Sequence, residues 1–85
     1  LECISRDVAA KITQKLRIPT IGIGAGVECD GQVLVVHDLL GLTSGYVPKH
    51  VKAYANLQET ISEATVAYCR DVKKGDFPGE ANSFS

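Results

Sequence analysis

The sequence predicts an α/β fold with parallel strands. Two stretches rich in β-branched residues, 19–23 and 32–37, are flanked by segments whose apolar residues have helical spacing. Three alternate glycines, Gly22, Gly24 and Gly26, end the first stretch, which is typical of a strand that opens into a loop where the backbone closely approaches another group. Because function in parallel α/β sheets sits at strand ends, we expect the site there.

The first 23 residues are predicted to form a βαβ unit. Residues 1–3 have the composition of a buried strand, and Ser5 is suited to cap a helix over residues 6–17. The apolar positions of that helix recur every fourth residue, at Val8, Ile12 and Leu16. Pro19 disfavours helical geometry at the residue before it, so the chain is expected to extend into the strand over residues 19–23.

The connection between the two predicted strands, residues 25–32, contains the turn formers Asp30 and Gly31. It is short for a parallel crossover, so the local sequence leaves open a hairpin, or a short helix capped by Asp30. The apolar run at residues 33–36 shows no alternation, which predicts a strand over residues 32–37 that is buried on both faces.

The second half is predicted to be mainly helical. Pro48 is suited to the first position of a helix, and the helical pattern then continues to Lys74. Thr60 and Glu63 have the spacing of a capping box, which suggests two helices with a break near residues 56–57. Gly75 is expected to stop the second helix, and the tail after it to be irregular.

Composition bounds the class of protein. The 85 residues are 45% hydrophobic with a formal net charge of −1, which fits at most one soluble domain and gives no electrostatic footprint for nucleic acid. No apolar run approaches the ~20 residues that span a bilayer, so no membrane is expected and the default location is the cytoplasm. The three cysteines are odd in number and irregularly spaced, which signals neither a disulfide framework nor a zinc site. The chain has no methionine and starts as if within a strand, so we expect a piece of a longer protein.

Several residues are candidates for chemistry. Glu2 lies in a predicted strand, where its carboxylate is either solvated or ion-paired, or catalytic. His37 and Asp38, at the predicted end of the other strand, either cap it or serve in acid–base or metal chemistry. The glycines match a dinucleotide-binding motif poorly, because Val27 occupies the position of the third glycine. They either provide room and positive φ angles at a strand end or line a substrate pocket. Cys29 has no evident activating neighbour and is expected to be an ordinary thiol.

Four segments, LEC, IPTIGIGAG, DGQVLVVHDLLG and FPGEANSF, together resemble the ketopantoate hydroxymethyltransferase family of pantothenate biosynthesis. The resemblance spans essentially the whole chain. It implies a (β/α)8 TIM barrel, of which residues 1–85 would be the C-terminal part of a single domain, with strands six to eight and their helices. It also implies that the short connection joins parallel strands.

The resemblance further implies a transferase that adds a hydroxymethyl group from 5,10-methylenetetrahydrofolate to 3-methyl-2-oxobutanoate, with Mg²⁺ bound to the oxo acid. Glu2 matches the family's general base, at the end of strand six. The metal ligands come from earlier strands, so none is expected in this chain. His37, Asp38 and the Gly22 to Gly26 loop would lie on the catalytic face without an assigned role.

As a third of a barrel, the chain is expected to be inactive alone and to aggregate unless it is joined by the remainder of the same polypeptide. The family resemblance suggests a large homo-oligomer, a decamer. Two alternatives stay open: a magnesium-dependent lyase or mutase of the related 2-oxo-acid barrel class, and a non-catalytic oligomerisation domain in which Glu2 is only ion-paired.

Overall fold

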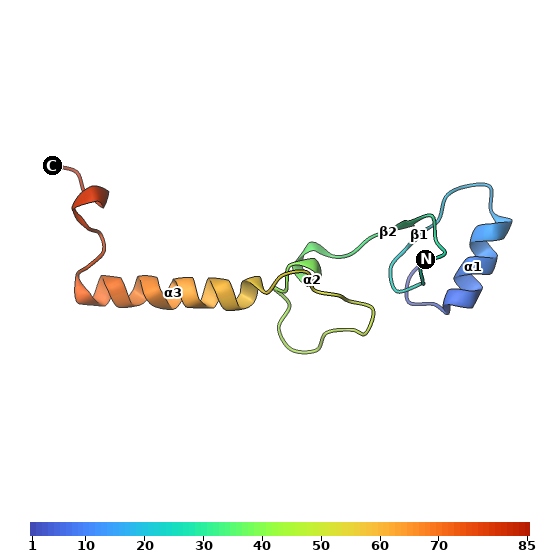
Figure 1. Ribbon diagram of the computed structural model, residues 1–85, viewed down its shortest axis with the longest axis horizontal. Helices are drawn as coiled ribbons and strands as arrows, with labels where there is room; N and C mark the ends of the chain where they lie inside the picture. Colours follow the sequence, from blue (N-terminus) through green and yellow to red (C-terminus); the bar gives the residue numbers. More distant parts are fainter.

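The computed structural model describes residues 1–85 as an elongated chain, shown in Figure 1. It measures 68 × 28 × 13 Å and has a radius of gyration of 21.6 Å. A compact domain of this length would have a radius of gyration of about 12 Å. The strands and first helix lie at one end and a long helix projects toward the other, so the chain does not close around one core.

The N-terminal end is the predicted βαβ unit. Helix α1, Arg6–Lys15, lies between residues 1–3 and strand β1, Ile21–Gly22. The first segment pairs with the strand in parallel through a bridge between Glu2 and Ile23. The N–H of Ile23 donates to the carbonyl of Leu1, and the N–H of Cys3 donates to the carbonyl of Ile23, both at 2.9 Å. The prediction of a βαβ unit is confirmed.

Strand β2, Gly31–Gln32, extends the sheet on the other side of β1 and runs parallel to it, with Ile21 opposite Gly31. The hairpin alternative is therefore wrong, and the connection is a short parallel crossover. No helix forms within it. The carboxylate of Asp30 instead accepts a hydrogen bond from the backbone N–H of Thr20 at 2.8 Å, which holds the connection against the start of β1.

Helix α1 covers one face of this small sheet. The hydroxyls of Thr13, on the helix, and Thr20, before β1, are 2.8 Å apart. Ser5 occupies the N-cap position as predicted, although its side chain makes no capping hydrogen bond. The helix ends two residues earlier than expected, because Leu16 already has an extended backbone on the way to Pro19.

The core is small. Its apolar members, Ala9, Ala25 and Cys29, pack together with the partly buried Ile4, and only five of the 85 residues are buried. Small side chains allow α1 and the loop after β1 to approach closely, but they remove little apolar surface from water. This core therefore fixes the local βαβ geometry without stabilising the rest of the chain.

The prediction of a buried strand over residues 32–37 is wrong. Strand β2 ends at Gln32, and the short helix α2, Val36–Leu39, follows. The side chains of Val33, Val35 and Val36 are each more than half exposed. A strand buried on both faces needs a neighbour on each edge and cover on each face, whereas β2 pairs only with β1.

The helix predicted from Pro48 is also wrong, since residues 48–56 contain no helix. Their backbone bonds instead to the end of α2: the N–H of Tyr54 donates to the carbonyl of Leu39 at 2.8 Å, and that of Leu57 to the carbonyl of Leu40 at 3.0 Å. The predicted break between two helices at residues 56–57 is the start of a single one: helix α3, Leu57–Lys74, begins there with Asn56 as its N-cap residue, and no helix immediately precedes it.

Helix α3 is continuous through the predicted capping box. Thr60 donates from its hydroxyl to the carbonyl of Asn56 within the first turn, so Thr60 does not start a helix. Gly75 ends α3 in the left-handed conformation, φ 80°, as predicted. The tail contains a single turn of 3₁₀ helix, Glu80–Asn82, and the ring of Phe77 packs edge-on to Tyr68 at 5.5 Å between centroids.

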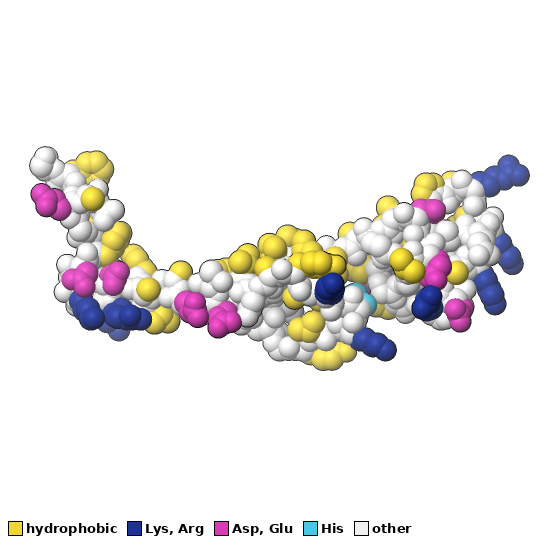
Figure 2. Space-filling model, in the orientation of Figure 1, with side chains coloured by type: hydrophobic (Ala, Val, Ile, Leu, Met, Phe, Trp, Pro, Cys, Tyr) yellow, Lys and Arg dark blue, Asp and Glu magenta, His cyan; other side chains and the backbone are white.

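Apolar side chains lie on the surface along most of the chain (Figure 2). On α3 they include Ile61, Val66, Tyr68 and Val72, each at least 46% exposed. No helix combines the length and the apolar character needed to cross a membrane.

Candidate functional site

The carboxyl ends of the three parallel segments open into one groove of about 850 Å³. We call it the strand-end groove; its walls include Cys3, Arg6, Gly24, Gly26, Lys49 and His50. The last two come from the loop between α2 and α3, which reaches back toward the strands (Figure 1). The groove lies where the sequence predicted a site, at the ends of parallel strands.

Glu2 lies on the uncovered face of the sheet; it does not line the strand-end groove, although its neighbour Cys3 does. Side chains alternate between the two faces of a strand, and residues paired in register share a face. Glu2 therefore shares a face with its partner Ile23, while Gly22 and Thr20 lie on the face covered by α1. The Glu2 side chain is exposed, and no side chain of these 85 residues forms an ion pair with its carboxylate. The carboxylate is thus available to a group outside the chain.

The backbone conformation requires glycine at two of the three loop positions, and at the third, Gly22, a Cβ would lie 2.8 Å from the Sγ of Cys29. Gly24 and Gly26 have φ of 65° and 90°, in the left-handed region, whereas Gly22 does not. A Cβ on Gly26 would lie 2.6 Å from the Cβ of Arg6, and one on Gly24 would lie 3.1 Å from the Cβ of His50. The same two glycines line the strand-end groove. At these positions glycine therefore both permits the backbone conformation and forms part of the groove wall.

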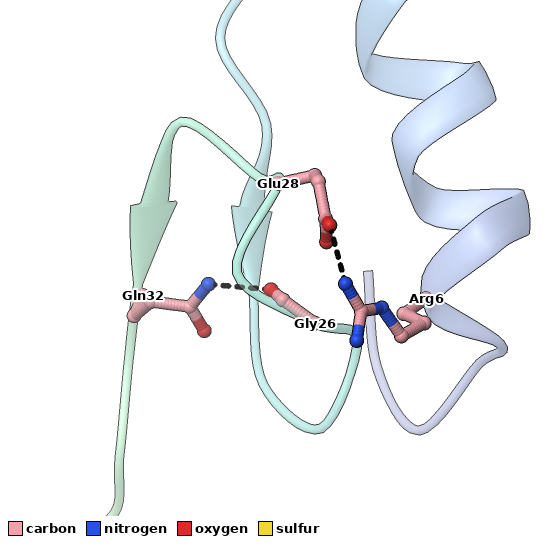
Figure 3. Close-up of polar contacts among 4 residues, drawn as sticks. All are labelled: Arg6, Gly26, Glu28 and Gln32. Carbon is pink, nitrogen blue, oxygen red and sulfur yellow. Dashed lines mark hydrogen bonds and ion pairs between the residues drawn. The ribbon is translucent and has the colours of Figure 1, made fainter.

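An ion pair fixes the loop that carries the glycines (Figure 3). The guanidinium of Arg6 donates to the carboxylate of Glu28 at 2.8 Å, and the amide of Gln32 donates to the carbonyl of Gly26 at 2.7 Å. The hydrogen bond from Arg6 lowers the pKa of Glu28, and the same bond raises the pKa of Arg6. The sequence did not single out this pair, because the partners are 22 residues apart.

His37 and Asp38 lie in α2 rather than at a strand end, and neither lines the strand-end groove. Their predicted position is wrong because β2 ends at Gln32, several residues earlier. The carboxylate of Asp38 accepts a hydrogen bond of 2.6 Å from the hydroxyl of Thr43, which secures the turn after α2. Cys29 is buried in the small core.

The acidic side chains present do not fit a magnesium site. Mg²⁺ requires near-octahedral oxygen coordination, commonly with one or two carboxylates and several waters or substrate oxygens. No three His, Cys, Asp or Glu side chains lie together in this chain. Glu2 lies on the sheet and the carboxylate of Asp38 is hydrogen-bonded to Thr43, so these two acidic groups do not form a common metal site.

His50 is the groove residue that sequence reasoning missed. Its Nδ1 lies 3.9 Å from the Sγ of Cys3, although the two residues are 47 positions apart. No local pattern marks His50, because the loop that carries it was predicted to be helical. In the structure this segment is a loop, and the N–H of Tyr54 within it donates to the carbonyl of Leu39 in α2.

These observations define a piece of a parallel α/β protein, with one uncovered sheet face and a groove at the carboxyl ends of its strands. The chain belongs to the ketopantoate hydroxymethyltransferase family, whose sequence profile matches residues 1–80. The family is one of TIM-barrel enzymes, and the chain is a small α/β piece of that fold.

Three relatives illustrate the similarity. The chain is 56% identical over 84 residues to the 3-methyl-2-oxobutanoate hydroxymethyltransferase of Acetivibrio thermocellus, covering 99% of this chain and 30% of that protein. It is 59% identical to the enzyme of the same name from Trichlorobacter lovleyi, covering 100% of the chain and 32% of the relative. The corresponding protein of a Geobacillus species is 58% identical, with 100% and 30% covered. The chain thus spans about a third of the length of these relatives.

Proposed function

We propose that the whole protein containing this chain is a hydroxymethyltransferase of pantothenate biosynthesis. It adds a hydroxymethyl group from 5,10-methylenetetrahydrofolate to 3-methyl-2-oxobutanoate and forms ketopantoate. Family membership and the names of relatives more than half identical to the chain support the proposal. The chain contributes about a third of such a protein, so the activity belongs to the assembled whole.

Within this chain we propose Glu2 as the general base. The observation that supports this role is its exposed carboxylate on the uncovered sheet face, unpaired within these 85 residues. Glu2 itself does not line the strand-end groove, but the next residue, Cys3, does. Glu2 accepts the proton from C3 of the oxo acid, and the adjacent carbonyl stabilises the electron pair left on C3. That pair forms the new C–C bond to the one-carbon unit. One water is consumed, and tetrahydrofolate leaves.

The remaining parts of the proposal concern the rest of the protein. We propose that residues 1–85 form strands six to eight of the barrel with their helices, and that Mg²⁺ is held by side chains outside this chain. We further propose that the whole protein forms a homo-oligomer, a decamer, and works in the cytoplasm.

The role of Glu2 is tested in the full-length protein by exchange of the C3 proton of 3-methyl-2-oxobutanoate with deuterated solvent. Glu2→Gln is expected to slow the exchange at least about 100-fold, because a positioned base contributes about 10² to 10⁴ in rate. Glu63→Gln, on the exposed helix α3, is the matched control and should leave the rate unchanged. Undiminished exchange in Glu2→Gln would remove Glu2 from the mechanism.

A second measurement tests the reaction class. Formation of ketopantoate by the full-length protein should require 5,10-methylenetetrahydrofolate. A lyase or mutase of the related barrel class would turn over a 2-oxo acid without folate, and a non-catalytic domain would not exchange the C3 proton at all.

A further inference from the structure

Cys3 and His50 meet in the wall of the strand-end groove. The Sγ of Cys3 lies 3.9 Å from Nδ1 of His50, and both side chains line the groove. Cys3 is exposed. A thiol beside an imidazole, open to a groove, is the arrangement in which a cysteine acts as a nucleophile, because the ring nitrogen can take the thiol proton.

The backbone is shaped to allow this contact. A Cβ on Gly24 would lie 3.1 Å from the Cβ of His50 and 3.2 Å from the Sγ of Cys3, so only glycine leaves room for the pair. Cys3 itself has φ 50°, in the left-handed region that residues other than glycine rarely adopt. Such strained residues gather at functional sites, because the surrounding structure must hold them in place.

We propose that Cys3 is a nucleophilic thiol site, with His50 as its proton acceptor, for small uncharged carbon electrophiles that enter the strand-end groove. With iodoacetamide, the sulfur forms a bond to the CH₂ carbon, the carbon–iodine bond breaks and iodide leaves. The thiol proton passes to Nδ1 of His50 and then to solvent. The proposed one-carbon transfer uses no cysteine, so this thiol would be a further reactive group near the same strand ends.

The charges around the pair are mixed. Arg6 and Lys49 line the same groove, and Glu2 adjoins Cys3 in the chain. The charge of Arg6 is largely offset by Glu28, its partner at 2.8 Å. The imidazole of His50 is thus the group that distinguishes Cys3 from an ordinary thiol.

The other two cysteines of the chain, Cys29 and Cys69, serve as controls for the reactivity of Cys3. Cys29 is only 7% exposed and packs against Gly22 in the core. Cys69 is exposed on α3, and the side chains around it are Thr65, Val66, Arg70 and Lys73, with no histidine. If exposure alone governed reactivity, Cys3 and Cys69 would behave alike.

The test measures alkylation of the full-length protein by iodoacetamide at pH 7, with each cysteine followed by peptide mass spectrometry. Native Cys3 is expected to react at least about tenfold faster than the same thiol in the urea-unfolded protein, since the thiolate is the reacting form. Native Cys69 should react no faster than in urea. A native rate for Cys3 at or below its rate in urea would overturn the proposal.

A variant assigns the effect to the imidazole. His50→Gln keeps a polar side chain that cannot take up the proton, and should bring the native rate of Cys3 down to its unfolded value. Lys52→Gln, two residues away, is the matched control and should keep the fast rate. Circular dichroism checks that each variant is folded. A fast Cys3 in folded His50→Gln would contradict the role of His50; if that variant does not fold, the wild-type comparison with urea still decides the proposal.

Discussion

Asp30 and Thr20 form three hydrogen bonds across the start of the sheet, the longest of them from the Thr20 hydroxyl to the Asp30 carboxylate at 3.4 Å. The carboxylate of Asp30 accepts the backbone N–H of Thr20 at 2.8 Å, and the N–H of Asp30 donates to the hydroxyl of Thr20 at 3.3 Å. The two residues precede β1 and β2, which this contact aligns in register. It replaces the helix that a parallel crossover normally carries.

Loss of this contact should destabilise the full-length protein. Asp30→Ala leaves the N–H of the buried Thr20 without its partner, at a cost of about 1–3 kcal/mol. Asp30→Asn keeps an oxygen acceptor and should lose less. Thermal unfolding of both variants checks the order, which would be contradicted if Asn were as damaging as Ala.

Two glycines provide a matched pair for backbone strain. Gly26 and Gly45 have φ of 90° and 82°, so alanine is strained at both, by about 1–2 kcal/mol. At Gly26 the added Cβ also lies 3.2 Å from the backbone Cα of Arg6, whereas nothing lies within 4 Å at Gly45. Overpacking should cost Gly26→Ala a further 1–3 kcal/mol or so. Denaturant unfolding of the full-length variants checks this difference, and equal losses would refute it.

The ion pair of Arg6 and Glu28 should depend on pH at the acid end. The hydrogen bond from Arg6 lowers the pKa of Glu28 below its ordinary value of 4.5. Because the carboxyl pKa is lowered in the folded state, the ion pair contributes to stability above pH 4.5, and this contribution is lost as the pH falls through the folded-state pKa of Glu28. Carboxyl NMR titration should show the pKa of Glu28 rising in Arg6→Gln and at high salt. An unchanged value in Arg6→Gln would show that the pair does not form in solution.

The isolated 85-residue chain should not fold as a cooperative monomer. Its five buried residues offer little apolar burial against the entropy of ordering the chain, and the apolar face of α3 is exposed. We expect no cooperative transition by calorimetry and association in size-exclusion chromatography. A monomer with a sharp transition would contradict this expectation.

The sequence predicted the elements that depend on local chemistry. Helix α1 follows from its apolar spacing and Pro19, and α3 ends at Gly75 because only a residue tolerant of positive φ suits that position. The groove was predicted at the ends of parallel strands. Glu2 was a candidate because it lies in a predicted strand, and the family resemblance favoured its role as general base. Its catalytic role stays a prediction until the exchange experiment is done.

The tertiary structure decided the features that depend on contacts between segments distant in sequence. The apolar run at residues 33–36 predicts a strand, but β2 has one neighbour and ends at Gln32; residues 33–35 are in neither strand nor helix, and α2 begins at Val36. Residues 48–56 carry a helix signal at Pro48, yet they form a loop whose Tyr54 N–H bonds to Leu39 at the end of α2, and this loop places His50 near Cys3. The physical reason is that local propensity is worth only fractions of a kcal/mol per residue, so backbone hydrogen bonds and strand partners far away in sequence override it.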